Sequence, residues 1–296
     1  MSLTYEPVGD PIAVISDIET EELKLVYVDQ DGEPEEKKSQ PSSLMDYCNS
    51  VIEGEDLDHL VKCLMQGMTI AEIATEPEEE ESLYSQSDMR EIDLEPTEEI
   101  QVLPSTLSER VLIAGPSGCR KSTWAATYAK NWLLQNPGKE VVLFCRTEDD
   151  PAYNLLECDE VEVTEDIYEA TLPIEDFKEK LVIFDDMDNL PWKDAKKFIH
   201  VLCNDLMANG RKLGIYVVYV SHTLMRGLET KVINNESNKV VLFNGCGDKQ
   251  NLAFLKEYAS METKQARAIT QIKCRWFCLN RNIPRYIIHE KGVILL

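Results

Sequence analysis

The sequence lacks the features that mark secreted, zinc-binding and membrane-spanning proteins. Its nine cysteines are odd in number and include no Cys-x-x-Cys pair, so we expect neither a disulfide framework nor a zinc site. No apolar run approaches the roughly 20 residues that cross a bilayer, and the N-terminus has no basic stretch followed by an apolar one. These absences predict an intracellular protein of a reducing compartment, with no membrane span.

Basic residues are scarce in the first hundred positions, where 5 Lys and Arg stand against 28 Asp and Glu, a net charge of −23. The balance is 11 against 19 over residues 101–200, a net of −8, and 14 against 7 over residues 201–296, a net of +7. The total of −24 therefore describes the N-terminal third. The basic C-terminal third can still face the phosphate backbone of a nucleic acid.

The apolar pattern divides the chain at residue 105. Residues 1–104 predict an acidic, partly disordered N-terminal region: a loosely ordered arm with a hairpin, a small helical element at 48–75 and a linker at 76–104. Residues 63–74 are similar to the first half of a helix-turn-helix. The acidic run that follows them would repel DNA, which favours a small docking element instead.

Residues 105–296 alternate strand-like and helical segments, which predicts an α/β fold with a mainly parallel central sheet flanked by helices. The expected strands are 110–114, 140–145, 181–184, 215–220 and 239–243, and the expected helices are 121–135, 193–209, 224–235 and 249–271. Two late strand-like runs, 274–279 and 285–289, predict a closing hairpin.

The first of these strands leads into a loop typical of phosphate-binding P-loops. The loop and the start of its helix consist of Gly115, Pro116, Ser117, Gly118, Cys119, Arg120, Lys121, Ser122 and Thr123. In such a strand–loop–helix unit, backbone N–H groups and the helix N-terminus point at a phosphate. We expect these residues to bind ATP, with Lys121 on the β- and γ-phosphates and Ser122 on Mg²⁺.

Arg120 departs from the P-loop pattern, which has glycine before the lysine. Glycine lets the backbone approach the phosphate with no Cβ in the way. Arginine is tolerated there if its φ is negative; otherwise ATP binding is weakened or lost. The presence of Lys121, Ser122, Asp185 and Asp186 favours retained binding.

Two further polar pairs follow strands of the expected sheet. Asp185 would hold Mg²⁺ and Asp186 would polarise the attacking water, as in a Walker-B motif; the alternative is an acidic strand end exposed to solvent. Ser221 and His222 can sense a γ-phosphate by hydrogen bonding. His222 equally suits a surface position that caps the next helix.

Together these motifs resemble the FtsK–HerA branch of P-loop ATPases, whose fold is RecA/ASCE-like, and especially the poxvirus-type genome-packaging ATPases of large double-stranded DNA viruses. The resemblance covers residues 107–290 and rests on 114–123, 184–187 and 210–214 leading to 221–222, with support from 143–152 and 227–243. It implies a ring of identical subunits that hydrolyses ATP with Mg²⁺ to move double-stranded DNA.

The same resemblance implies roles that the motifs alone leave open. Arg211 matches the arginine that reaches into the neighbouring subunit's site, although alone it suits a solvated turn. A packaging motor implies viral DNA as its partner and a location in the host cytoplasm, a virus factory or the virion. Residues 1–100 take no part in the resemblance; for this acidic region we expect a capsid protein as a further partner.

Two other functions remain open on the sequence alone. A P-loop kinase of nucleoside-type small molecules would need a mobile arginine-rich lid; residues 275–285 hold three arginines but have the pattern of a hairpin. A nucleotide-binding scaffold with weak or no hydrolysis would follow if Arg120 spoils the loop.

Overall fold

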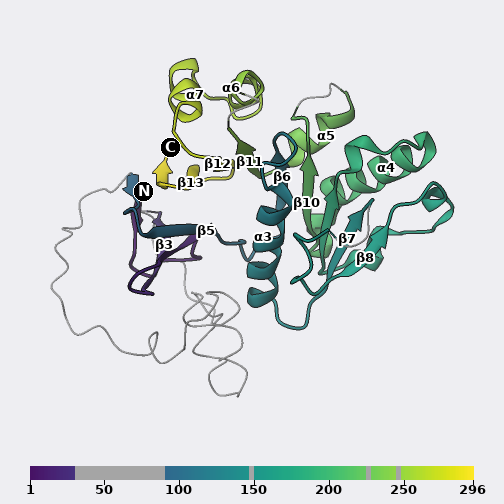
Figure 1. The fold of residues 1–296 in the computed structure, drawn as a ribbon, viewed down its shortest axis with the longest axis horizontal. Helices are drawn as coiled ribbons and strands as arrows, with labels where there is room; N and C mark the ends of the chain where they lie inside the picture. The colour runs from purple at the N-terminus through teal and green to yellow at the C-terminus, as the bar shows by residue number, and fades with distance from the viewer. Residues whose placement is uncertain (31–90, 147–149, 225–227, 245–247) are drawn as a thin grey trace. The chain divides into compact units, whose positions relative to one another are not determined.

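The computed structural model describes residues 1–30, 91–146, 150–224, 228–244 and 248–296 (Figure 1). The chain divides into two compact units, one of Met1–Thr106 with Pro284–Leu296 and the other of Leu107–Ile283. The helical element expected at 48–75, including the helix-turn-helix-like residues 63–74, lies outside the described residues.

The second unit is built on a mainly parallel sheet. Its strands lie in the order β12 (Trp276–Asn280), β11 (Lys239–Phe243), β6 (Arg110–Ala114), β10 (Tyr216–Ser221), β9 (Leu181–Asp185), β7 (Val141–Cys145) and β8 (Asp159–Glu162). All these neighbours pair in parallel except β12, which is antiparallel to β11. The α/β class with a mainly parallel sheet is confirmed.

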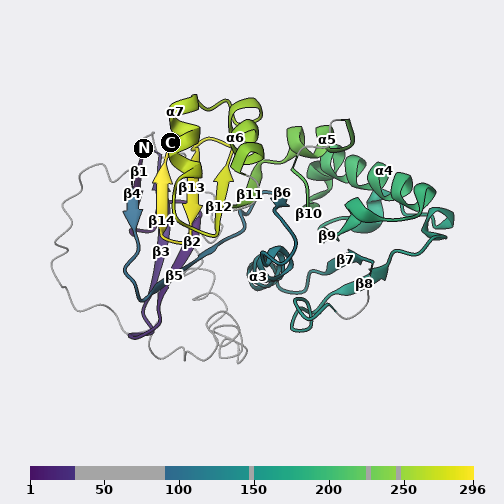
Figure 2. The same ribbon diagram turned by 45° about the horizontal axis from the view of Figure 1, so that its top comes forward.

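Helices cover both faces of this sheet, which explains why its strands are continuous apolar runs. Figure 2 shows α3 (Lys121–Gln135) on one face and α4 (Lys193–Asn209) with α5 (Leu228–Glu236) on the other. Every residue of β7, β9, β10, β11 and β12 is buried. The core of this unit therefore lies on both sides of the strands that carry the phosphate-binding motif.

The helix expected over 249–271 is in fact two helices, α6 (Asp248–Glu257) and α7 (Thr263–Thr270), which pack side by side (Figures 1 and 2). The N–H of Met261 donates to the carbonyl of Leu255 at 3.0 Å, and Ser260 has a φ of 51°. A left-handed residue with such a back-bonded N–H ends a helix. The single-helix prediction was wrong for this reason.

The first unit contains an antiparallel sheet in the order β1 (Ser2–Thr4), β3 (Leu23–Asp29), β2 (Ala13–Asp17) and β5 (Glu98–Val102). The expectation of a loosely ordered arm was wrong for residues 1–30, although the expected hairpin is present as β2 and β3. Three side chains of this hairpin, Ala13, Ile15 and Val26, are fully buried. Short apolar runs suffice here because several strands share one core.

The expected linker was also wrong for part of its length. Besides β5, residues 91–104 include β4 (Glu91–Asp93), which pairs with β14 (Gly292–Leu295), and β14 in turn pairs with β13 (Tyr286–His289). β4 and β5 mix acidic or other polar residues with buried apolar ones, so no continuous apolar run marks these two strands. Residues 284–296, which the sequence analysis assigned to the second domain, group with the first unit.

Candidate nucleotide-binding site

The carboxyl ends of β6, β10 and β9 lie next to one another. Ala114 pairs with Ser221, and Val220 pairs with Asp185, in parallel ladders. The loops that leave these strands therefore start at one edge of the sheet, as polar groups around a nucleotide require. This edge brings together the P-loop, the Asp185–Asp186 pair and the Ser221–His222 pair.

At the start of the P-loop, directly after β6, there is no space for a residue larger than Gly115. The N–H of Gly115 donates to the carbonyl of Ser221 at 3.2 Å. A Cβ on Gly115 would lie 2.7 Å from the Cβ of Phe243 and 3.0 Å from the Sγ of Cys119. Gly118 adopts a φ of 77°, which glycine tolerates at little cost. Both glycines are thus required by the shape of the loop.

Arg120 adopts the left-handed conformation, with φ 73° and ψ 35°, immediately before α3. The negative φ under which the sequence analysis considered arginine tolerable is therefore not present. A non-glycine residue in this region costs about 1–2 kcal/mol. The side chain of Arg120 is exposed. The backbone therefore keeps the left-handed conformation that glycine favours, although the residue is arginine.

Lys121 begins α3 and points back across the loop. Its side chain is buried, and its Nζ donates to the carbonyl of Pro116 at 3.0 Å. The same Nζ lies 3.3 Å from Nδ1 of His222. Lys121 therefore links the start of the P-loop to the end of β10.

His222 also contacts Asp186, since its Nε2 lies 2.5 Å from the Asp186 Oδ1. A neutral imidazole that accepts from Lys121 at Nδ1 and donates to Asp186 from Nε2 satisfies both contacts. The residues directly before α5 (Leu228–Glu236) lie outside the described part of the chain, so the alternative position for His222, as a cap on the next helix, stays a prediction. His222 bridges two other candidate residues.

Asp185 is buried at the end of β9, so it is not the solvent-exposed strand end considered as an alternative. Its Oδ2 accepts a hydrogen bond from the hydroxyl of Tyr153 at 2.7 Å. Burial raises the pKa of Asp185 above its usual value, although the hydroxyls of Tyr153 and Ser122 act in the opposite direction. Its Oδ1 is buried and has no hydrogen-bond partner among the described residues.

This unpartnered oxygen bears on the expected Mg²⁺ site. Mg²⁺ takes hard oxygen ligands, commonly one or two from protein side chains. The Asp185 carboxylate and the Ser122 hydroxyl next to it fit that need. Within the described residues, no group of three or more His, Cys, Asp or Glu is placed to hold a metal.

Sequence reasoning missed Asp188, which is buried in the turn after β9. Its carboxylate accepts hydrogen bonds from the hydroxyl of Tyr219 at 2.8 Å, from the hydroxyl of Ser221, and from the N–H of His222 at 3.2 Å. Asp188 thus holds the end of β10 against the loop after β9. In the sequence it stands beside two other aspartates, and nothing in the pattern separates it from them.

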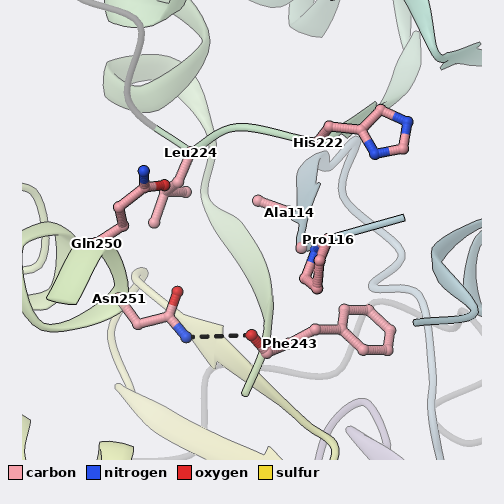
Figure 3. A pocket seen from close by; sticks show the side chains of 8 residues that line it. Ala114, Pro116, His222, Leu224, Phe243, Gln250 and Asn251 are labelled. Atoms are coloured by element: carbon pink, nitrogen blue, oxygen red, sulfur yellow. Dashed lines mark hydrogen bonds between the residues drawn. The ribbon is translucent and has the colours of Figure 1, made fainter. Parts of the chain in front are cut away.

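Two pockets lie at the carboxyl ends of the parallel strands. One, of about 120 Å³, lies between the start of the loop and α6 (Figure 3). The described residues that line it include no Asp, Glu, Lys or Arg; among them are Pro116, Phe243, Gln250 and Asn251. The side-chain amide of Asn251 donates to the carbonyl of Phe243 at 3.2 Å, the contact drawn in Figure 3.

The other pocket, of about 190 Å³, lies over the ends of β7 and β9. It is lined by three carboxylates, Asp150, Asp185 and Asp186, together with Arg146 and Tyr153. Tyr153 is a further residue that the sequence analysis missed, although it follows the 143–152 segment that carried part of the resemblance. An anionic lining of this kind favours a cation or the neutral attacking water over a phosphate.

Arg211 does not join this edge of the sheet. It lies in the turn before β10, near Arg110 at the start of β6. Burial is the larger cause that lowers the pKa of the Arg110 guanidinium, and the nearby positive charge of Arg211 lowers that pKa further. The starts of β6 and β10 are separated from their carboxyl ends by about 15 Å of strand. Arg211 is therefore far from Lys121 within one chain.

Comparison with known proteins finds a relative encoded by a virophage. The chain is 33% identical over 187 residues to the uncharacterised protein V3 of the Sputnik virophage, and the match spans 62% of this chain and 76% of V3. The chain belongs to the family of protein V3. Because V3 is described as uncharacterised, membership of the V3 family assigns no activity. No protein-family model matches the sequence.

Solved structures with some similarity include the genome packaging NTPase B204 from Sulfolobus turreted icosahedral virus 2 with AMPPCP. Its TM-score is 0.43 at 14% identity, over 62% of this chain and 97% of B204. The pCW3 conjugation coupling protein TcpA with ATPgS has a TM-score of 0.42 at 15% identity, over 63% of this chain and 60% of TcpA. Scores below 0.5 assign no function to the V3-family chain.

One further property concerns membranes. Of the helices in the described part of the chain, none combines the length and apolar character needed to cross a bilayer.

Proposed function

We propose that this chain is an ATP-hydrolysing P-loop motor of the FtsK–HerA type that translocates double-stranded DNA and packages a viral genome. One observation carries the proposal: Lys121, His222 and Asp186 form a continuous chain of contacts beside the P-loop. The buried Asp185 lies at the end of the neighbouring strand. These are the groups that phosphoryl transfer from ATP to water needs.

Phosphate binding follows from the loop and the helix behind it. The N-terminus of α3 and the backbone N–H groups of the loop attract an anion. Lys121 Nζ would exchange its present acceptors, Pro116 O and His222 Nδ1, for the β- and γ-phosphates. Ser122 and Asp185 would hold Mg²⁺, which supplies positive charge to the phosphates when bound.

Water activation falls to the residues after β9 and β10. Asp186 has a half-exposed side chain next to the loop, from where its carboxylate can accept a hydrogen bond from the attacking water and orient it. His222 fixes one of its oxygens. Asp188 holds Ser221 and the backbone of His222. Because His222 in turn contacts Asp186, Asp188 would support both the γ-phosphate sensor and the carboxylate that orients water.

Arg211 would serve a neighbouring subunit. Because it lies at the opposite edge of the sheet from its own P-loop, it can stabilise phosphoryl charge only in another copy of the chain, as an arginine finger does. This role supports a homo-oligomeric ring. DNA as the cargo, a capsid protein as partner of the acidic N-terminal region, and a location in the infected cell or virion belong to the same proposal; relation to a virophage protein supports the viral setting.

The kinase alternative is disfavoured by Arg281, one of the arginines its mobile lid would need. The guanidinium of Arg281 donates from Nη1 to the carbonyls of Asn234 at 2.7 Å and Ser237 at 2.5 Å. A side chain bound to fixed carbonyls at the end of α5 is not free to close over a substrate.

The decisive experiment measures ATP hydrolysis with and without duplex DNA, together with particle mass. We expect a ring whose hydrolysis rises when DNA is added. Lys121→Ala should abolish hydrolysis while leaving the fold intact, whereas Lys130→Ala, on the same helix away from the loop, should not. A monomer that phosphorylates a nucleoside, or a protein that binds no nucleotide, would contradict the proposal.

A further inference from the structure

We infer that one surface of α6 and α7 binds the phosphate backbone of duplex DNA. We call it the α6–α7 basic surface; it consists of Lys249, Lys256, Lys264, Arg267 and Lys273. The inference rests on the proposed function, which leaves open where the DNA lies, and adds a location for it.

The charge of this segment contrasts with that of the chain. Residues 249–275 contain six Lys and Arg and two Asp and Glu, a net of +4, in a protein with a net charge of −24. All five residues of the α6–α7 basic surface are exposed. None of the ion pairs found between described residues involves them. Their charge is therefore available to a partner.

The helical spacing places these charges on outward faces. Lys249 and Lys256 are seven residues apart on α6, which separates them by about 10 Å along one face, the axial length of about three base pairs. Lys264 and Arg267 are three apart on α7 and share a face, while Ala266 and Ile269 are buried against the unit. Each helix thus offers two cations to an extended anion.

The same helices are connected to the candidate nucleotide site. Gln250 and Asn251, in the first turn of α6, line the pocket beside Pro116 (Figure 3). Asn251 is buried, and it ties α6 to the Phe243 carbonyl at the end of β11. Phe243 in turn fills the space against Gly115. A change in the P-loop on ATP binding or hydrolysis can therefore displace α6, and with it the α6–α7 basic surface.

Duplex DNA fits this surface better than an acidic polypeptide does. DNA carries one negative charge per about 1.7 Å of its axis, whereas an extended acidic chain offers at most one per about 3.3 Å. The two pairs of cations on α6 and α7 match the DNA backbone, whose negative charges are denser and regularly spaced. An acidic segment, such as residues 31–90 with 16 Asp and Glu against 4 Lys and Arg, is the competing occupant.

The test compares two triple variants of the full chain with equal loss of charge. The first is Lys256→Gln, Lys264→Gln and Arg267→Gln; the matched control is Lys178→Gln, Lys193→Gln and Lys197→Gln, which are exposed residues elsewhere in the same unit. Affinity for a fluorescent duplex is measured by anisotropy over a salt series, and basal ATP hydrolysis and thermal unfolding are measured in parallel.

For the first variant we expect duplex affinity to fall on the order of 100-fold at about 0.1 M salt, and the slope of log Kd against log salt to shrink by about 2.7, or 0.9 for each lost contact. DNA stimulation of hydrolysis should disappear, while the basal rate and the unfolding temperature stay unchanged. The control should keep the wild-type slope.

Each contrary result has a distinct meaning. If the wild type binds and is stimulated by duplex DNA but the first variant does so equally, the surface is wrong and the proposed motor function stands. Equal loss in both variants shows general charge attraction and overturns the surface. Tighter binding of polyglutamate than of duplex assigns it to an acidic polypeptide. If the wild type binds no DNA, the proposed function fails as well.

Discussion

The Nζ of Lys121 lies 3.3 Å from Nδ1 of His222, whose other ring nitrogen contacts Asp186. Lys121 is thus held by the residue that also contacts Asp186, the carboxylate proposed to polarise water. On the proposed function, a Lys121 that moved to a phosphate would leave the imidazole without this donor and with its link to Asp186. His222 would then connect phosphate binding to water activation.

Substitutions of His222 that keep only one of its two contacts, with Lys121 or with Asp186, can separate its two proposed roles. We expect His222→Ala to lower hydrolysis about 10- to 100-fold with ATP affinity retained. Asn at this position can replace the Nδ1 acceptor, and Gln the Nε2 donor. If orientation of Asp186 matters for the chemical step, His222→Gln should keep more of kcat than His222→Asn. The reverse order would assign His222 to positioning Lys121 instead.

Arg120 makes a specific stability prediction, because a left-handed arginine is strained. Replacing it with glycine removes about 1–2 kcal/mol of strain but adds about 0.5–1 kcal/mol of backbone entropy in the unfolded chain. We expect Arg120→Gly to raise the free energy of unfolding by up to about 1 kcal/mol in denaturant titrations. Arg120→Ala, which keeps the Cβ, should change it little.

The same variant tests whether the loop binds nucleotide. Because the backbone already has the conformation of a glycine at this position, the wild type should bind ATP within a few-fold of Arg120→Gly in a calorimetric titration. Binding by the variant alone would favour the scaffold alternative and remove the motor proposal.

Asp185 is expected to trade stability for function. Burial raises its pKa in the folded protein above the ordinary value of 3.8, so the ionised form destabilises the fold at neutral pH. Asp185→Asn should raise the free energy of unfolding at pH 7 and abolish hydrolysis. The gain should shrink as pH falls through the raised pKa and vanish below 3.8, where both side chains are neutral. Asp186→Asn, at a half-exposed position, should lack this gain.

Asp188 provides a test of the support beneath the sensor residues. The two carboxylate oxygens of Asp188 accept hydrogen bonds from Tyr219, Ser221 and His222. Asparagine replaces one of these oxygens with an NH₂ group, which donates and cannot accept. Asp188→Asn should therefore lower the free energy of unfolding by about 1–3 kcal/mol in urea titrations. Asp205→Asn, exposed on α4, should shift it by less than about 0.5 kcal/mol. An equal response of both variants would remove the supporting role.

Arg211 can be tested by mixing subunits. Arg211→Ala should abolish hydrolysis while nucleotide binding persists, and Asp186→Asn should do the same. A mixed ring contains interfaces with one intact Asp186 and one intact Arg211, so mixing the two variants should restore part of the rate. A mixture as inactive as its components would rule out a finger that acts between subunits.

The central sheet was predictable because its strands are buried on both sides. Residues 110–114 and 239–243 were placed to the residue, since a strand in such a sheet is a nearly continuous apolar run, here following one basic residue in each case. β8, with the sequence Asp-Glu-Val-Glu, lies at the sheet edge and is mostly exposed. Its residues carry no such signal, and it was missed.

The site was predictable in its motifs but not in its connections. Parallel strands bring Lys121, Asp185 and His222 to one edge, and that follows from topology. The bridge through His222 and the three bonds to Asp188 depend on side-chain directions that a residue pattern does not contain. The sign of φ at Arg120 was not predictable for the same reason, because a loop can hold an unfavourable backbone conformation when its surroundings fix it.

The ion pair between Glu109 and Lys239 has a mechanical consequence. Both side chains are buried where β6 and β11 begin, 2.8 Å apart, and Tyr128 also bonds to Glu109. Sliding one strand past the other would separate two charges in an interior of low dielectric constant, which is strongly unfavourable. The ion pair thus opposes sliding of β6 along β11 at the end remote from the P-loop. In the proposed motor, movement driven by ATP would therefore come from the loops and α6, with β6 and β11 held in register.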